Sequence, residues 1–363
     1  MAGGAVMDIV AVPDAIRWQA DHAERNGAPA TARIIRALLA LEGSGAATAR
    51  RIFGWEGLSL RDAMPLRIAA GFHHLLLTGS EPDLAAIYDE RLTDQVAVDA
   101  VVLSLVETHD ERLLPWLDHP PQTNEAGRSA SIVAGLLWLA QRVTPRFELL
   151  EIGASAGINT MLARYRYDLG GVAVGPVDSQ MVIAPEWRGP PPPDRPMAID
   201  SARGCDIAPV DLTDPEQALR LKSYIWPEAK ERMGRMEAAI ALARQAPPEL
   251  ERADAGAWVG AALEREQEEG TTRVLFHSVM WQYLSNETQA IIEESMVAAG
   301  QLADAKRPLA WIALETNRET FAHELRVRYW PDGAEPVHLA TAHPHGAWVE
   351  WMGSANVTKV RSS

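Results

Sequence analysis

A short apolar segment followed by a loop of very small residues constrains the fold of this chain more than any other feature. The segment FELLEIG covers residues 147–153, follows Pro145, and runs into GASAG at 153–157. An apolar run of this length, bounded by Pro and Gly, is typical of a strand that is buried on both faces of a sheet. The next residues, INTMLARYR, have helical spacing. The sequence therefore predicts a strand, a tight turn and a helix, which is a unit of α/β folds.

The residues after this junction alternate between strand-like and helix-like segments. Such alternation predicts a mostly parallel, doubly wound (Rossmann-like) sheet with helices on both faces, and we expect its last two strands to form an antiparallel hairpin. Segment 165–196 breaks the alternation with a hairpin-like stretch and a run of prolines, so we interpret it as an insertion. The expected strands are 147–153, 203–211, 249–254, 272–278, 308–315, 324–330 and 346–352, and the expected helices are 130–143, 215–245, 256–268 and 287–299.

The residues before the junction have a different pattern. From Pro13 to Leu117, apolar residues recur at three- and four-residue spacing, and glycines and prolines separate the periodic segments. The polar stretch 118–129 contains a Pro pair and is expected to be a loop. We therefore predict an all-helical N-terminal domain at 1–120 and an α/β domain at 121–363.

Composition and charge exclude several classes of protein. The 363 residues are 47% hydrophobic and 23% charged, which is typical of a folded chain with a sizeable core. Acidic residues exceed basic ones by 49 to 34, so the net charge of −15 disfavours a nucleic-acid partner. The single cysteine, Cys205, excludes an intramolecular disulfide and a multi-cysteine zinc site, and we expect no metal.

Two further segments bear on localisation. The first residues, MAGGAVMDIVAVPD, have no basic residue before their apolar ones and do not match a signal peptide. The apolar run IVAGLLWLA at 132–140 is half as long as the ~18 residues that a membrane span needs. We therefore expect a cytoplasmic protein that binds no membrane, and the sequence gives no indication of its oligomeric state.

The GASAG loop has four interpretations. Its small residues suit the close approach of a nucleotide-type cofactor to backbone amides at a helix start. It also fits G-x-S-x-G, the nucleophile elbow of α/β-hydrolases, with Ser155 as nucleophile. It fits the dinucleotide fingerprint G-x-G-x-x-G poorly, because Ser155 and Ile158 replace two glycines. The fourth interpretation is that small residues only pack a tight turn.

The position of the loop favours the cofactor interpretation over the hydrolase. A hydrolase elbow follows several strands, and one oxyanion donor comes from an earlier strand-to-helix loop. The sequence before Arg146 contains no strand pattern, so that donor has no obvious source. A serine triad also needs an acid and a histidine downstream, and ten histidines make such a match easy to find by chance.

The segment LLEIGASAG resembles motif I of class I S-adenosylmethionine-dependent methyltransferases, in which a strand and an acid precede alternating glycines. Glu151 matches the acid, Gly153 and Gly157 match the outer glycines, and Ser155 replaces the middle one. The resemblance implies that Asp206 in RGCDIAP binds the ribose hydroxyls and that Asp254 in ERADAG faces the adenine. Asp206 lies 206 − 151 = 55 residues after Glu151, against the ~20 usual between glycine loop and ribose acid, and the insertion accounts for most of the excess. Both aspartates also suit the capping of a following turn. The expected cofactor is S-adenosylmethionine, and its expected contacts are Glu151, Gly153, Ala154, Ser155, Gly157, Asn159, Asp206, Asp254 and Arg128. The resemblance implies methyl transfer to a small molecule, and the alternative is a protein that binds the cofactor or a nucleotide without catalysis.

Several longer segments resemble a bacterial family known as domain of unknown function 2332. The resemblance covers most of the chain, including the helical N-terminal part. It implies a methyltransferase-like fold, and the family has no established activity. The segments are QTNEAGRSA (122–130), LEIGASAGIN (150–159), RGCDIAPVDLTDP (203–215), FHSVMWQYLS (276–285) and TAHPHGAW (341–348).

The end of the fourth expected strand carries the candidate catalytic residues. Ligands of parallel sheets lie beyond the carboxyl ends of the strands, where His277 can act as general base. Tyr283 is the second catalytic candidate, and Trp281 and Gln282 are expected to bind a small-molecule substrate. The alternative is that these aromatic residues belong to the core and that His277 bonds only to the backbone.

Two other polar segments have weaker assignments. Asn124, Glu125 and Arg128 precede a helix, where we favour helix capping over a contact between Arg128 and the cofactor's carboxylate. His343 and His345 lie in a turn between the last strands, and too few further ligands lie nearby for a metal site. We expect this turn at the surface, and the alternative is a turn that reaches the rim of the active site.

Overall fold

The computed structural model describes residues 9–79 and 81–353, which form two compact units. The first unit extends to Thr123 and also includes Asp214–Gly234. The second consists of Asn124–Thr213 and the chain from Arg235 onward. The sequence predicts the change near residue 120, but it does not predict that a later segment joins the first unit.

The first unit is helical, as its spacing predicts. Its apolar stripes bury one continuous core that includes Ile34, Leu38, Phe72 and Val102. The helices are α2 (Val12–Arg25), α3 (Pro29–Ala37), α4 (Ala47–Phe53), α5 (Met64–Leu77), α6 (Pro82–Tyr88), α7 (Gln95–Leu113) and α9 (Pro215–Ser223), with short 3₁₀ turns η1 (Leu38–Leu41) and η2 (Leu114–Leu117).

Two polar contacts attach the later segment to this helical core. The Glu228 carboxylate accepts hydrogen bonds from the backbone N–H of Thr31 at 2.8 Å and from its hydroxyl at 2.7 Å. This contact satisfies a free amide in the first turn of α3. Buried His73 lies with Nδ1 3.1 Å from the carbonyl oxygen of Ser223.

The second unit contains a nine-stranded sheet. Its order is β5-β12-β11-β10-β9-β8-β1-β6-β7. The five strands from β9 to β7 are parallel, while β10, β11 and β12 are joined to β9 by successive antiparallel pairings. The bounds are β1 (Arg146–Ile152), β5 (Glu186–Arg188), β6 (Ala198–Asp206), β7 (Glu249–Arg252), β8 (Thr272–Ser278), β9 (Leu309–Thr316), β10 (His323–Trp330), β11 (Gly333–Ala342) and β12 (Trp348–Trp351).

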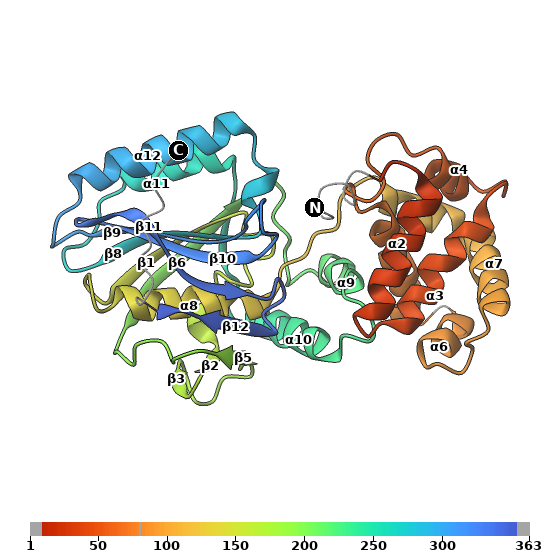
Figure 1. Ribbon diagram of the computed structural model, residues 1–363, viewed down its shortest axis with the longest axis horizontal. Coiled ribbons are helices and arrows are strands. Elements are labelled where there is room, and N and C mark those ends of the chain that lie inside the picture. The colour runs from red at the N-terminus through yellow and green to blue at the C-terminus, as the bar shows by residue number, and fades with distance from the viewer. Residues whose placement is uncertain (1–8, 80, 354–363) are drawn as a thin grey trace. The chain divides into compact units, whose positions relative to one another are not determined.

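Helices cover both faces of this sheet (Figure 1). On one face lies α8 (Ser129–Leu139), every residue of which is buried. On the other face lie α11 (Ala255–Glu264) and α12 (Asn286–Leu302), which share a core with Leu150, Ile152 and Leu275 of the central strands. The expected α/β fold is confirmed, with a mostly parallel sheet and antiparallel strands at its end.

Several boundaries differ from the sequence prediction. The helix expected at 215–245 is two helices, α9 and α10 (Lys230–Gln245), because Pro227 lies between them. The last two expected strands, β10 and β12, do not pair with each other. The unpredicted strand β11 lies between them and pairs with both. The insertion forms its own small sheet of β2 (Arg166–Leu169), β3 (Val172–Val174) and β4 (Val182–Ile183), in which β2 and β3 make the expected hairpin.

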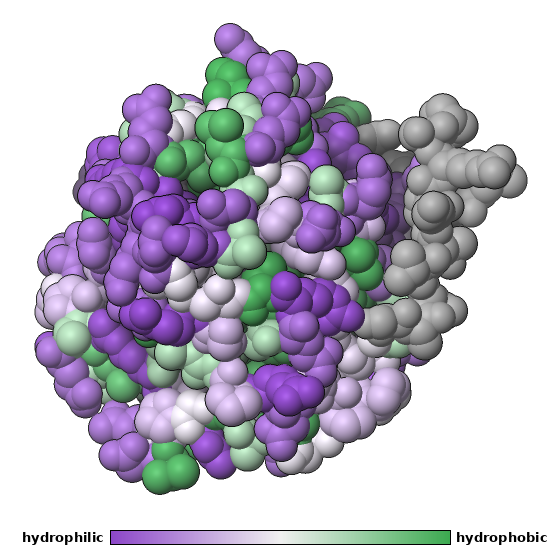
Figure 2. All heavy atoms as spheres, turned by 90° about the vertical axis from the view of Figure 1, so that its left-hand side faces the viewer, coloured by the Kyte–Doolittle hydropathy of each residue, from purple (hydrophilic) through white to green (hydrophobic). Residues whose placement is uncertain are grey.

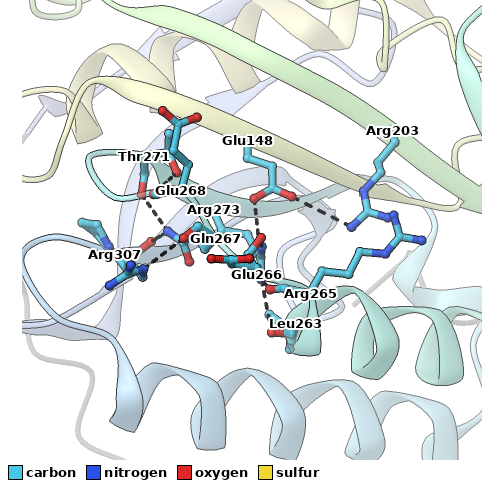
Figure 3. A network of polar contacts seen from close by, with 11 residues as sticks. Glu148, Arg203, Leu263, Arg265, Glu266, Gln267, Glu268, Thr271, Arg273 and Arg307 are labelled. Atoms are coloured by element: carbon cyan, nitrogen blue, oxygen red, sulfur yellow. Dashed lines mark hydrogen bonds and ion pairs between the residues drawn. The ribbon is translucent and has the colours of Figure 1, made fainter.

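The amino-terminal half of the sheet carries a buried ionic network on the α11 side (Figure 3). Arg273 Nε donates to Glu148 Oε2 at 2.9 Å, and Arg203 lies 3.9 Å from the other carboxylate oxygen. The remaining nitrogens of Arg273 donate to carbonyls at the end of α11, those of Leu263, Arg265 and Glu266. Arg273 thus caps α11 and joins it to two strands.

On one face of the molecule, hydrophilic and apolar side chains are interspersed (Figure 2). Within the described residues, no helix is both long enough and apolar enough to cross a membrane.

Candidate functional site

The order of the strands defines where a ligand is expected in the second unit. Strand β1 lies between β6 and β8, which follow it in sequence on opposite sides. The connections therefore diverge at the carboxyl end of β1, and ligands of doubly wound sheets bind at such a switch point. The residues of interest are those after Ile152 and after Ser278.

The loop after β1 is held by its neighbours through its backbone. Gly153, Ser155 and Gly157 all have positive φ, at 64°, 52° and 69°. The N–H of Ala154 donates to the carbonyl of Cys205 at 3.0 Å, and that of Ser155 donates to Asp206 Oδ2 at 2.8 Å. Glycine at 153 and 157 suits this conformation, because other residues rarely adopt it.

The helix expected after this loop is absent from the structure. Residues 155–161 form turns, followed by the 3₁₀ turn η4 (Leu162–Arg164). The N–H of Ile158 donates instead to Asn124 Oδ1 at 2.8 Å. The prediction of a cofactor cradled by a helix N-terminus is therefore wrong in that detail, and any ligand must be held by the loop and by side chains.

The three acids named from the resemblance lie at the ends of neighbouring strands. Glu151 is buried on β1 and accepts a hydrogen bond from the Thr160 hydroxyl at 2.5 Å. Burial raises the pKa of Glu151 to about 8, and the charge of Asp206 adds to this effect. Asp206 ends β6 and accepts from the N–H groups of Ser155 and Ala208, one to each oxygen. Asp254 follows β7 and caps α11 by accepting from the N–H of Ala257.

A methionine covers the first glycine of the loop. A Cβ atom built on Gly153 would lie 2.7 Å from Met280 Cγ, so the loop after β8 packs directly against the loop after β1. Gly204 on β6 packs just as closely against the same loop, since a Cβ atom built on it would lie 2.8 Å from the Cβ of Ala154. A larger residue at either position would separate these segments.

Two side chains of this loop carry buried polar atoms that have no hydrogen-bond partner among the described residues. Asn159 is 1% exposed, and both its Oδ1 and its Nδ2 are unpartnered. The Oγ of Ser155 is also unpartnered, so it makes no hydrogen bond to a histidine. Because buried polar groups are rarely left unbonded, such atoms are candidates for contact with a ligand or an ordered water.

The segment before α8 joins three loops rather than capping its helix. Asn124 holds the β1 loop, and Glu125 lies 3.3 Å from Arg235. Arg128 donates to the carbonyl of Pro344 at 2.8 Å and to that of Ser278 at 3.5 Å. Our expectation of capping is wrong, since no side chain caps α8.

The same contacts bring the His343–His345 turn to the site. A Cβ on Gly127 would lie 2.5 Å from the carbonyl oxygen of His345, so the two backbones touch. The backbone N–H of His345 donates to Nδ1 of His343 at 3.1 Å. The turn is half-buried at the carboxyl edge of the sheet, so it is closer to the alternative, a turn that reaches the strand ends, than to the surface turn that we favoured.

His277 is part of a histidine–glutamate pair. Its Nδ1 lies 2.7 Å from Glu315 Oε1, which also accepts from the backbone N–H groups of Met280 and Trp281. The imidazole is 1% exposed, and the Trp281 ring stacks on it at 5.0 Å and 19°. Our prediction included His277 and Trp281 but missed Glu315. The sequence does show an acid at the end of the fifth parallel strand, and this position could have identified it.

The other residues of this loop point elsewhere. Tyr283 is 77% exposed, and Gln282 is also exposed. Both side chains therefore differ from His277, which is buried, and their predicted roles in catalysis and substrate binding stay predictions. Among the described residues, no cluster of His, Cys, Asp and Glu has the arrangement of a metal site.

Residues 13–351 match a family described as uncharacterized proteins conserved in bacteria (DUF2332). The chain belongs to the DUF2332 family. No curated protein and no solved structure matches it. The five segments that resemble DUF2332 in sequence meet at the carboxyl edge of the sheet, through the contacts of Asn124, Asp206, Met280, Gly127 and Arg128 described above.

Proposed function

We propose that this DUF2332 protein is an enzyme that transfers a methyl group from S-adenosylmethionine to a small molecule. The observation that carries the proposal is the His277–Glu315 pair at the end of β8, beside the loop at the switch point. Glu315 fixes the imidazole through Nδ1, which leaves Nε2 directed away from it as a general base.

The residues at the strand ends fit the expected cofactor. Each oxygen of the Asp206 carboxylate accepts one amide hydrogen bond and has a second lone pair, so ribose hydroxyls can still donate to it. The unpartnered amide of Asn159 and hydroxyl of Ser155 offer further polar contacts in the same loop. Approach to Gly153 requires Met280 to move, which its unbranched side chain allows.

When bound, S-adenosylmethionine supplies an electrophilic methyl group on a positively charged sulfur. His277 Nε2 takes the proton of the acceptor as the acceptor atom bonds to the methyl carbon. The transfer would break the methyl–sulfur bond of the bound cofactor and would leave its electron pair on sulfur. Glu315 stabilises the imidazolium that forms, as a carboxylate partner does in other histidine bases.

Calorimetry with S-adenosylmethionine and S-adenosylhomocysteine tests the cofactor. We expect saturable binding of both and at least tenfold weaker binding by Asp206→Ala. If neither compound binds, the proposal fails. If the wild type binds but Asp206→Ala binds equally well, the ribose assignment is wrong. Transfer of labelled methyl groups into a small-molecule extract then separates an enzyme from a protein that only binds the cofactor.

A serine hydrolase is the second candidate, because Ser155 has a positive φ and an unpartnered hydroxyl within G-x-S-x-G. Against it, the described residues before Arg146 contain no strand, so the usual second oxyanion donor is missing. Labelling of Ser155 by a fluorophosphonate would favour this function over methyl transfer.

A further inference from the structure

A buried hydrogen-bond acceptor and a buried donor lie together on neighbouring strands. His277 on β8 pairs with Ala313 on β9, and Leu275 pairs with Trp311, so the side chains of 277 and 311 point to the same face. Their ring centroids are 6.0 Å apart. Within the described residues, neither His277 Nε2 nor Trp311 Nε1 has a hydrogen-bond partner.

The chemical roles of the two atoms follow from their surroundings. Glu315 Oε1 accepts from two backbone amides and lies 2.7 Å from Nδ1 of His277, so we assign the proton of His277 to Nδ1. Nε2 is then an acceptor. Trp311 Nε1–H can only donate. A buried polar atom without a hydrogen bond destabilises the folded state, and a ligand that bonds to both atoms removes this cost.

We propose that His277 Nε2 and Trp311 Nε1–H together bind one hydroxyl group of the substrate. The hydroxyl donates to the imidazole and its oxygen accepts from the indole, which satisfies both atoms at once. A carboxylate has no proton to donate, and an alkylammonium has no lone pair to accept with. A neutral hydroxyl also avoids placing a charge in this buried region.

The surrounding rings favour an aromatic hydroxyl, that is, a phenol. The ring centroid of Trp281 lies 5.0 Å from that of His277 and 5.5 Å from that of Trp311, so the two unpartnered atoms belong to an aromatic cluster, against which a ligand's own aromatic ring can pack. This inference rests on the proposed function and names its acceptor: the oxygen that is methylated is the one held by Trp311, and its proton passes to His277.

Titration of the ¹⁵N-labelled full chain with phenol, anisole and benzene tests the inference. The Trp311 indole resonance is assigned from Trp311→Phe and the ring nitrogens of His277 from His277→Gln. We expect phenol to shift both sets of resonances saturably. Anisole, which cannot donate, and benzene should bind at least tenfold more weakly.

The variants give a second readout. Trp311→Phe and His277→Gln should each weaken phenol binding at least tenfold. Trp258→Phe is the matched control, since Trp258 belongs to the same core as Trp311 but is not among the unpartnered groups. If Trp311→Phe does not fold, the wild-type shifts with phenol and anisole still decide the question.

Three outcomes would overturn the inference: equal binding of phenol and anisole, no shift of either residue, or a bound water that phenol does not displace. Calorimetry with S-adenosylmethionine is run on the same samples. If the cofactor binds and phenol does not, only the substrate class is wrong. If phenol binds and the cofactor does not, the proposed function is wrong and the hydroxyl site remains.

Discussion

On the face of the sheet that α11 and α12 cover, the amino ends of β8 and its neighbours differ from their carboxyl ends. The difference lies in the partners of their polar side chains. At the amino end, Glu148 and Arg273 bond to each other, and Arg273 also caps α11. At the carboxyl end, Glu315 holds His277, but the far side of the imidazole and the indole N–H of Trp311 have no partner in the described part of the chain. Arg203 at the amino end has Nη atoms without a hydrogen bond, but they lie within 4 Å of two carboxylates, those of Glu148 and Glu251. The amino end thus carries an ionic network, whereas the unpartnered atoms of His277 and Trp311 have neither a hydrogen bond nor an ion pair among the described residues.

The largest effect is expected at the carboxyl end. His277→Gln should lower the rate of methyl transfer about 100- to 10,000-fold, because a general base contributes that much. The urea midpoint of unfolding should change little, since the contact with Glu315 is the side-chain hydrogen bond of His277 that is lost. If His277→Gln keeps the wild-type rate, His277 has no catalytic role. If the variant instead loses much of its stability, the role of His277 is structural.

The amino end should show the reverse behaviour. Arg273→Met removes the partner of Glu148 and uncaps α11, and we expect a loss of about 3–5 kcal/mol in unfolding free energy. The affinity of the folded protein for S-adenosylmethionine should stay within twofold. Arg307→Met is the control, because Arg307 belongs to the same network but is partly exposed, and it should cost less than about 1 kcal/mol.

The pKa of Glu151 gives the carboxyl end a pH dependence. A folded-state pKa of about 8 lies above the unfolded value, so folding is favoured at low pH and stability falls as the pH rises toward 8. The slope is about 1.4 kcal/mol per pH unit for one group. Glu151→Gln should abolish this slope in urea unfolding between pH 5 and pH 8. An unchanged slope would show that Arg128 and Thr160 keep Glu151 ionised.

The smallest effect separates capping from binding at Asp254. Asp254→Ala should cost about 1 kcal/mol of stability, whereas Asp254→Ser keeps a cap for α11. If Asp254 also contacts the adenine, both variants should bind S-adenosylmethionine more weakly, by about tenfold for a lost hydrogen bond. Normal affinity in Asp254→Ser would leave this residue a helix cap alone.

The sequence predicted the fold better than the site because periodic burial is a local signal. The apolar run of β1 and the helical spacing of the first unit report burial directly, and both predictions are confirmed. The His277–Glu315 and Arg128–Pro344 contacts join residues 38 and 216 positions apart, so no local pattern reveals them. The helix expected after GASAG is absent, and residues 155–161 form turns in which the Ile158 amide donates to Asn124, a contact that joins residues 34 positions apart and that no local pattern reveals.

The return of Asp214–Gly234 to the helical unit has a consequence for dissecting the protein. The chain passes between the two units three times, after Thr123, after Thr213 and after Gly234. A single proteolytic cut therefore cannot release either unit, and truncation after residue 123 would deprive Thr31 of Glu228 and His73 of Ser223. Asp214–Gly234 lies between β6 and β7, so part of the helical unit belongs to the connection between two strands of the sheet. The contribution of the helical unit to stability and binding must therefore be studied by substitutions in the full chain.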